Sequence, residues 1–179
     1  ATAAKPLGKD EVVCRFDNAE RRLIELRFRD SQGRVVSFDE LDSDLILLDF
    51  WGTWCQPCIE SIPHMNEIQR TLGGKKVQVI GVACEREPNK AARTKHVNEV
   101  ATRLKVNYPV LVTGLDAFCP VQDAFQVDVY PTMVLLDRKG NVIWRERGAT
   151  EATLARMDRY ILRGLKLPVF NELPEIGAR

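Results

Sequence analysis

Two cysteines separated by two residues, Cys55 and Cys58, are the most reactive feature of the sequence. If a helix begins at this point, both sulfur atoms lie on one side of its first turn, close enough to form a disulfide. Unpaired backbone N–H groups at a helix N-terminus stabilise a thiolate, so the pKa of Cys55 should fall below its usual value of about 8.5. We therefore expect Cys55 to be the nucleophile. Cys58, one turn inside and less exposed, should attack the mixed disulfide that Cys55 forms with a substrate.

A buried strand should lead into this motif, and a helix should leave it. Leu45–Phe50 is a continuous apolar run that is too short for a helix, which is typical of a strand buried on both faces. Beyond Cys58 apolar residues recur at helical spacing until Gly73 ends the helix, and Pro63 should kink it. These apolar positions are Ile62, Met65, Ile68 and Leu72.

Strands and helices are expected to alternate along the rest of the chain. Further strands are predicted over residues 77–83, 110–112, 132–136 and 142–144, and further helices over 97–104, 121–125 and from a capping Thr150 to Ile161. Ahead of the cysteines, residues 12–16, 24–28 and 34–38 alternate as strands of a hairpin region. The sequence thus predicts an α/β fold, with a mixed central β-sheet flanked by helices on both faces and an N-terminal β-hairpin extension.

The length of 179 residues fits one domain, with an extension at 1–21, a core at 22–165 and a tail at 166–179. The poorly patterned ends are residues 1–9 and 168–179. A chain of this length buries roughly 70% of its unfolded surface and needs no disulfide to fold. The cysteine pair therefore requires another explanation. We expect a monomer.

The charge balance excludes several classes of partner. Twenty-six basic and 25 acidic residues give a net charge of +1, which argues against binding to nucleic acid or an anionic membrane. No apolar run approaches the ~18 residues of a transmembrane helix, so this chain should not insert into a membrane. Residues 1–6 are compatible with what remains after a signal or anchor is removed.

The motif and its surroundings resemble the thioredoxin superfamily, and specifically the TlpA/ResA-like thiol:disulfide oxidoreductases. The resemblance rests on residues 49–58, on Pro63 five positions after Cys58, and on Tyr130-Pro131-Thr132, and it covers roughly residues 22–165. It implies a cis Tyr130–Pro131 bond opposite the cysteines. In this family the backbone of Tyr130 would pair with an extended substrate, while Pro131 offers no N–H group.

Three residues at the cysteines complete the expected substrate-binding surface. Trp54, Gln56 and Pro57 lie beside or between Cys55 and Cys58 in the sequence. A tryptophan in such a position supplies a large apolar contact area with one polar group. We expect these residues to act together with Tyr130 and Pro131.

Two carboxylates are candidates for proton transfer. Asp49 ends an otherwise apolar strand, so burial should raise its pKa well above about 3.9 and allow it to exchange protons with Cys58. The resemblance implies the same role, because thioredoxin itself has Asp here, whereas many TlpA/ResA-like proteins have Asn. Glu85 follows the strand over residues 77–83. The resemblance to ResA-like proteins places an acidic residue there, beside the cysteine pair.

The remaining cysteines, Cys14, Cys84 and Cys119, are odd in number, so at least one is free or pairs with another molecule. A Cys84–Cys119 disulfide is geometrically possible if the strands near them are parallel neighbours, and the sequence leaves this open. A structural zinc site needs four ligands, and the sequence has no second close pair to provide them. We expect no bound metal.

The sequence therefore predicts a thiol:disulfide oxidoreductase that cycles Cys55 and Cys58 between disulfide and dithiol. Its substrates would be protein cysteines, an upstream redox partner would restore it, and it would need no cofactor. Gln56-Pro57 resembles the reducing members of the superfamily, which favours a reductase. The resemblance also implies a periplasmic or other extracytoplasmic location.

Two alternatives remain. A peroxiredoxin-like peroxide reductase would use a sulfenic acid, but its Pro-x-x-x-Thr-x-x-Cys signature is missing. A non-catalytic binding or metal-delivery module is disfavoured by the presence of Asp49, both cysteines and Pro131 together.

Overall fold

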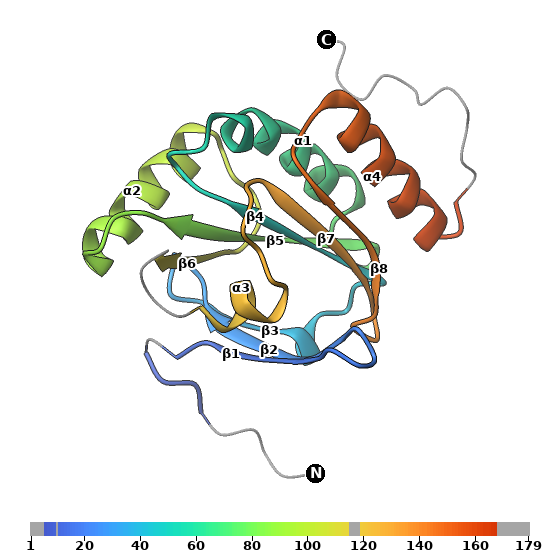
Figure 1. The fold of residues 1–179 in the computed structure, drawn as a ribbon, viewed down its shortest axis with the longest axis horizontal. Helices are drawn as coiled ribbons and strands as arrows, with labels where there is room; N and C mark the ends of the chain where they lie inside the picture. Colours follow the sequence, from blue (N-terminus) through green and yellow to red (C-terminus); the bar gives the residue numbers. More distant parts are fainter. Residues whose placement is uncertain (1–5, 10, 115–118, 168–179) are drawn as a thin grey trace.

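The computed structural model describes residues 6–9, 11–114 and 119–167, so most of the two poorly patterned ends lies outside the described residues. It contains a five-stranded sheet in the order β6-β5-β4-β7-β8 and a three-stranded N-terminal sheet in the order β1-β2-β3 (Figure 1). The strands are β1 (Val13–Asp17), β2 (Arg22–Arg29), β3 (Val35–Ser37), β4 (Leu45–Trp51), β5 (Val77–Glu85), β6 (Val110–Gly114), β7 (Thr132–Asp137) and β8 (Val142–Arg147). The helices are α1 (Gln56–Leu72), α2 (Lys90–Arg103), α3 (Pro120–Ala124) and α4 (Glu151–Gly164), with a 3-10 turn, η1, at Phe38–Glu40.

The central sheet is mixed, as predicted. Strands β4, β5 and β6 are parallel, whereas β7 is antiparallel to both β4 and β8. Every residue of β4 is buried, in agreement with its continuous apolar run. Because α1 follows directly from the carboxyl end of this central strand, the cysteine motif is fixed to the most buried element of the molecule.

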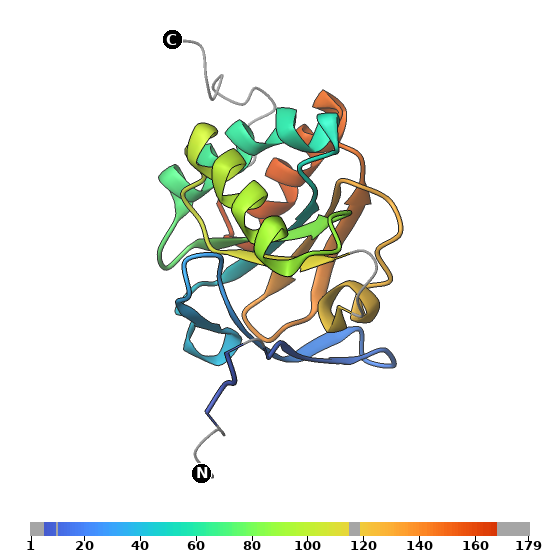
Figure 2. The same ribbon diagram turned by 90° about the vertical axis from the view of Figure 1, so that its left-hand side faces the viewer.

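The central sheet separates two apolar cores. Alternate side chains of β4 enter different cores: Leu47 and Trp51 lie on the α1 side, and Leu48 lies on the other. Helices α1, α2 and α4 cover the first face, and the N-terminal sheet and the short α3 cover the second (Figures 1 and 2). Helices do flank both faces, but all three long ones share one face. The period-2 pattern of β2 explains this, because it gives the small sheet an apolar face that must itself be buried.

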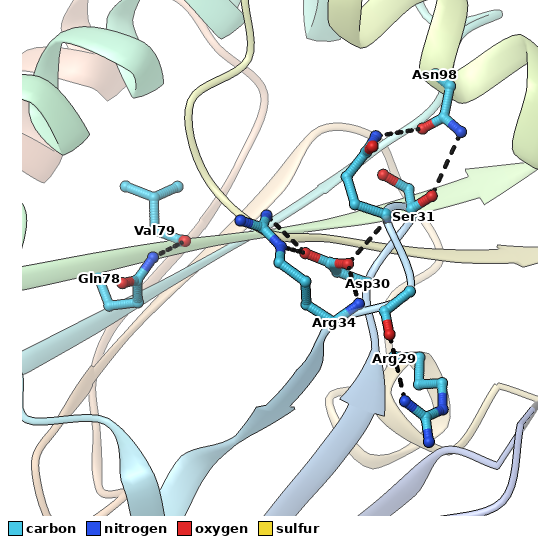
Figure 3. Close-up of polar contacts among 9 residues, drawn as sticks. Arg29, Asp30, Ser31, Arg34, Gln78, Val79 and Asn98 are labelled. Carbon is cyan, nitrogen blue, oxygen red and sulfur yellow. Dashed lines mark hydrogen bonds and ion pairs between the residues drawn. The ribbon is translucent and has the colours of Figure 1, made fainter.

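The turn between β2 and β3 fixes the N-terminal sheet to the central sheet (Figure 3). The buried Asp30 carboxylate accepts hydrogen bonds from Arg34, at 2.8 Å from Nε and 2.9 Å from the backbone N. The backbone N–H of Ser31 donates to the Val110 carbonyl of β6 at 2.8 Å, and the Asn98 side chain of α2 donates to the Ser31 carbonyl at 3.4 Å. The sheet is thus held by directional contacts as well as by its apolar face.

The helix ends also follow the sequence. The Thr150 side chain accepts a hydrogen bond from the Thr153 backbone N–H, which confirms the predicted cap of α4. Pro63 lies inside α1, and Gly73 caps its end. Within the described residues, no helix is both long and apolar enough to cross a membrane.

Phe28→Ala should destabilise the protein by about 3–5 kcal/mol, because the Phe28 side chain is fully buried between the two sheets. Urea unfolding followed by circular dichroism measures the effect. The matched control is Val35→Ala on the adjacent β3, where the side chain is 46% exposed and the change should stay within about 0.5 kcal/mol. Equal effects of the two substitutions would show that the apolar face of the small sheet does not hold it in place.

Candidate active site

The predicted cysteine pair forms a disulfide at the start of α1. Cys55 and Cys58 are bonded, with 5.3 Å between their Cα atoms, which lies in the usual range for a disulfide. Cys55 is the N-cap residue of the helix, and the Ile59 N–H donates to its carbonyl. Pro57 lies in the first turn, where its missing N–H costs no helical hydrogen bond. The N-terminal N–H groups of α1 therefore lie at Cys55, as the sequence analysis required.

The two sulfur-bearing residues differ in accessibility. Cys55 is 5% exposed and Cys58 is fully buried, whereas Gln56 and Pro57 between them are exposed. A substrate can therefore approach Cys55 but not Cys58. This is the order of exposure that the sequence analysis expects for a nucleophile and a resolving cysteine.

Trp54 forms an aromatic platform next to Cys55. Its indole N–H donates to the Cys84 carbonyl at 2.9 Å, and its ring meets that of Tyr130 edge to face with centroids 5.4 Å apart. The exposed guanidinium of Arg86 lies 3.8 Å from the ring centroid, in a cation–π contact. Sequence reasoning predicted Trp54 and Tyr130 for the substrate surface but missed Arg86, whose signal is its position directly after Glu85.

Gly52 is required for this arrangement. A Cβ atom at position 52 would lie 2.5 Å from Nε1 of Trp54 and 2.9 Å from the Cys84 carbonyl oxygen. Both contacts are shorter than real Cβ contacts allow. Any side chain at position 52 would therefore break the hydrogen bond that orients the indole.

The segment before β7 contains the expected cis peptide bond, between Tyr130 and Pro131. Pro131 is buried and Tyr130 half-buried, and both lie next to Val129, which is 41% exposed. The Thr132 hydroxyl donates to the Val129 carbonyl at 2.7 Å, and the Gly148 N–H donates to the Pro131 carbonyl at 2.8 Å. The segment is thus fixed from both sides while Val129 faces solvent.

Glu85 holds the loop that precedes Cys55. It is 2% exposed, and its carboxylate accepts two hydrogen bonds from Thr53, one from the backbone N at 2.7 Å and one from the hydroxyl at 2.6 Å. Both carboxylate oxygens are therefore engaged by Thr53, a residue that sequence reasoning did not select. The pairing of Glu85 with Thr53 could not be predicted from the sequence, because the contact depends on the packing of β4 next to β5.

Asp49 is fully buried on the face of β4 that packs against α1, the face on which Cys58 lies. Neither of its carboxylate oxygens has a hydrogen-bond partner among the described residues. Burial raises the pKa of Asp49 from 3.8 to about 7. The direction agrees with the sequence analysis, and the value suits a group that gains and loses a proton near neutral pH.

The other three cysteines are free thiols, so a Cys84–Cys119 disulfide, which the sequence left open, is not formed. Cys84 and Cys119 lie in the core on the opposite side of the sheet from the active-site disulfide, and the half-buried Cys14 packs against that core. Burial chiefly raises the pKa of Cys14 to about 12 and that of Cys84 well above its usual range. Thiols of this kind are unreactive. Among the described residues, no group of three or more His, Cys, Asp and Glu side chains is placed to hold a metal ion.

A mixed sheet, a disulfide at the start of the first long helix and a cis proline before an antiparallel strand together define a thioredoxin-like redox protein. Residues 18–161 match the family model described as Redoxin, and the chain belongs to this family. The predicted membership of the thioredoxin superfamily and the predicted thiol:disulfide oxidoreductase class are thereby confirmed.

Named relatives agree with this assignment. The chain is 27% identical over 132 residues to the thiol-disulfide oxidoreductase ResA of Bacillus cereus, covering 74% of this chain and 70% of that protein. A thiol:disulfide interchange protein of Chlorobium tepidum superposes with a TM-score of 0.65 at 23% identity, over 79% of this chain and 93% of that one. The exposed lipoprotein thioredoxin Etrx1 of Streptococcus pneumoniae gives 0.61 at 24% identity, over 79% and 98%. At these identities the two structures support the fold alone.

Asp49→Asn should stabilise the oxidised protein at pH 8 by up to about 4 kcal/mol, because the raised pKa of Asp49 makes its ionisation unfavourable in the folded state. Below pH 3.8 both folded and unfolded chains carry the protonated group and the cost vanishes. The wild-type protein should therefore lose stability, relative to the variant, as pH rises from about 4 to about 7.

Urea unfolding across this pH range measures the difference. Asp44→Asn, at an exposed position just before β4, is the matched control and should show no such trend. A stability difference between Asp49→Asn and wild type that is constant with pH would contradict the assignment.

Proposed function

We propose that this protein reduces disulfides in other proteins, with Cys55 as the nucleophile and Cys58 as the resolving cysteine. The observation that carries the proposal is the disulfide at the start of α1, in which only Cys55 reaches the surface. Thiol–disulfide exchange needs one accessible thiolate and a second thiol held within bonding distance of the first. The protein needs no bound cofactor, because the two electrons reside in the cysteine pair.

The reaction proceeds by two exchanges. In the reduced protein the Cys55 thiolate attacks one sulfur of a substrate disulfide, forming a mixed disulfide and releasing the other substrate sulfur as a thiolate. Cys58 then loses its proton and attacks Cys55. The substrate leaves with two thiols, Cys55 and Cys58 are left as a disulfide, and two electrons have passed to the substrate. An upstream thiol donor restores the dithiol.

Asp49 is the proton acceptor for Cys58 in this scheme. Its pKa of about 7 lets it take a proton from the buried thiol and return it in the next cycle. The sequence suggested Glu85 as a second group for proton transfer, but we assign it the role of a positioning residue. Both of its oxygens hold Thr53 and so fix the loop that carries Cys55.

The substrate-binding surface consists of the exposed residues around Cys55 and the segment before β7. Gln56 and Pro57 are exposed on one side, and Trp54 and Tyr130 provide apolar contact on the other. The absence of an N–H at Pro131 leaves no backbone donor there to compete for a substrate sulfur. An extended substrate segment would lie along Tyr130 and Val129.

The compartment is also a proposal. We place the protein outside the cytoplasm, since structural disulfides form and persist there and a reductase then has protein substrates. The Gln56-Pro57 pair favours the reducing direction, as in the members that it resembles.

Cys58→Ser should trap substrates, because Cys55 can still form the mixed disulfide but nothing resolves it. With insulin as a disulfide-containing probe, we expect a covalent complex on a non-reducing gel that dithiothreitol dissolves, with Cys55 in the linked peptide by mass spectrometry. Cys55→Ser is the matched control and should form no complex, because the remaining thiols are buried or have raised pKa values. Equal trapping by both variants would refute Cys55 as the nucleophile.

The reduction potential should lie closer to about −270 mV, the reducing end of the superfamily, than to about −120 mV, the oxidising end. Equilibration with dithiothreitol buffers followed by alkylation and mass spectrometry measures it. The fluorescence of Trp54, which lies beside the disulfide, provides an independent signal. A value at the oxidising end would contradict the reductase assignment while leaving the exchange chemistry intact.

A further inference from the structure

Four buried polar atoms without partners lie beneath the active site. They are both carboxylate oxygens of Asp49, Nε1 of Trp51 and the hydroxyl of Tyr108, and none has a hydrogen-bond partner among the described residues. Asp49 and Trp51 are fully buried and Tyr108 is 5% exposed. A buried polar group left unpaired costs about 1–3 kcal/mol, so a concentration of four requires an explanation.

These atoms belong to one place in the fold. Asp49 and Trp51 are two positions apart on β4 and lie on its α1 side, and Asp49 pairs with Gly81 of β5 in register. A Cβ atom at Gly81 would lie 3.0 Å from Nε1 of Trp51 and 3.1 Å from the Tyr108 ring. The absence of a side chain at Gly81 therefore lets the indole nitrogen and the phenol ring both approach this point of β5, which is paired with Asp49.

The donor and acceptor count fits a single bridging molecule. Trp51 offers one N–H donor, Tyr108 offers one O–H donor, and ionised Asp49 offers only acceptors. A water molecule accepts two hydrogen bonds and donates two. It can accept from Trp51 and Tyr108 while donating to Asp49, which satisfies all three groups together.

We infer that Asp49, Trp51 and Tyr108 form a buried water-binding site, through which Tyr108 positions the hydrogen bond that stabilises the Asp49 carboxylate. The inference rests on the proposed role of Asp49 as the proton acceptor for Cys58. Tyr108 is a positioning residue in this arrangement, because it acts on Asp49 and touches neither the substrate nor the sulfur atoms.

Among the described residues, Asp49 has titratable neighbours on β5, on α1 and just before β6. Tyr108 precedes β6, Cys84 lies on β5, and Cys58 packs on the same face from α1, while β7 presents the non-titratable Met133 opposite Asp49. Burial first and the nearby Asp49 second raise the pKa of Tyr108 well above its usual value, so Tyr108 remains a hydrogen-bond donor at every working pH. For Cys84 burial dominates, and Asp49 contributes least.

Nuclear magnetic resonance tests the water site directly in the intact oxidised protein. We expect a cross-peak between water and the indole N–H of Trp51, one of three tryptophans in the chain. Its sign should be that of a bound water molecule with a long residence time. This measurement requires no substitution. A Trp51 indole that shows no contact with bound water would overturn the inference.

Tyr108→Phe tests the effect on Asp49. Removal of the hydroxyl should weaken the water contact and raise the pKa of Asp49 by about one pH unit, because a hydrogen bond to the charged form is lost. The pKa is measured from the pH dependence of the Asp49 carboxyl ¹³C chemical shift. Tyr160→Phe, at a 36% exposed position on α4, is the matched control and should leave the titration unchanged. An unchanged Asp49 titration in Tyr108→Phe would overturn the role of Tyr108.

The two proposals can fail separately. If Tyr108→Phe leaves the Asp49 titration unchanged while Cys58→Ser still traps insulin, the role of Tyr108 at the water site is wrong and the exchange function stands. If Cys58→Ser traps nothing but the Asp49 titration moves as expected, the inference about the water site survives as a structural one. A Tyr108→Phe variant that binds water at Trp51 as strongly as wild type would also contradict the site as described.

Discussion

The burial of β4 on both faces is the constraint on which the rest of the structure depends. Because every one of its side chains enters one of the two cores, the strand cannot shift in register without exposing apolar surface. Its carboxyl end therefore delivers Trp51 and the following loop to a fixed point. The disulfide at the start of α1 inherits its position from this strand, and so does the carboxylate of Asp49.

The loop between β4 and α1 is held by polar contacts to the neighbouring β5. Glu85 accepts two hydrogen bonds from Thr53, and the Cys84 carbonyl accepts one from the Trp54 indole. Two consecutive residues at the end of β5 thus fix two consecutive residues of the loop that follows β4. These hydrogen bonds fix the loop that leads to Cys55, and the helix N-terminus determines the environment of its sulfur.

Much of this could be predicted from the sequence, because the deciding signals are local. The apolar run of β4, the spacing of Cys55 and Cys58, and the Tyr130-Pro131 segment each carry their meaning within a few residues. What could not be predicted depends on contacts across strands. The pairing of Glu85 with Thr53 and the stacking of Arg86 on Trp54 require the order of the strands.

The same limit applies to the thiols and to Tyr108. A Cys84–Cys119 disulfide looked feasible because strand adjacency alone does not fix whether two sulfurs meet, and both remain free. Nothing in the sequence marks Gly81 as the residue whose missing side chain lets Tyr108 approach Trp51. Local patterns therefore identified the reacting groups, and packing decided which neighbours tune them.

The division of side chains between two cores has a consequence for how this molecule can change over evolutionary time. The disulfide and its buried carboxylate lie above the sheet, while the N-terminal sheet and the three spare thiols lie below it. Substitutions far apart that share no neighbours tend to act additively. Substitutions in the N-terminal sheet and its core could therefore accumulate during evolution with little effect on the redox chemistry on the other face of the central sheet.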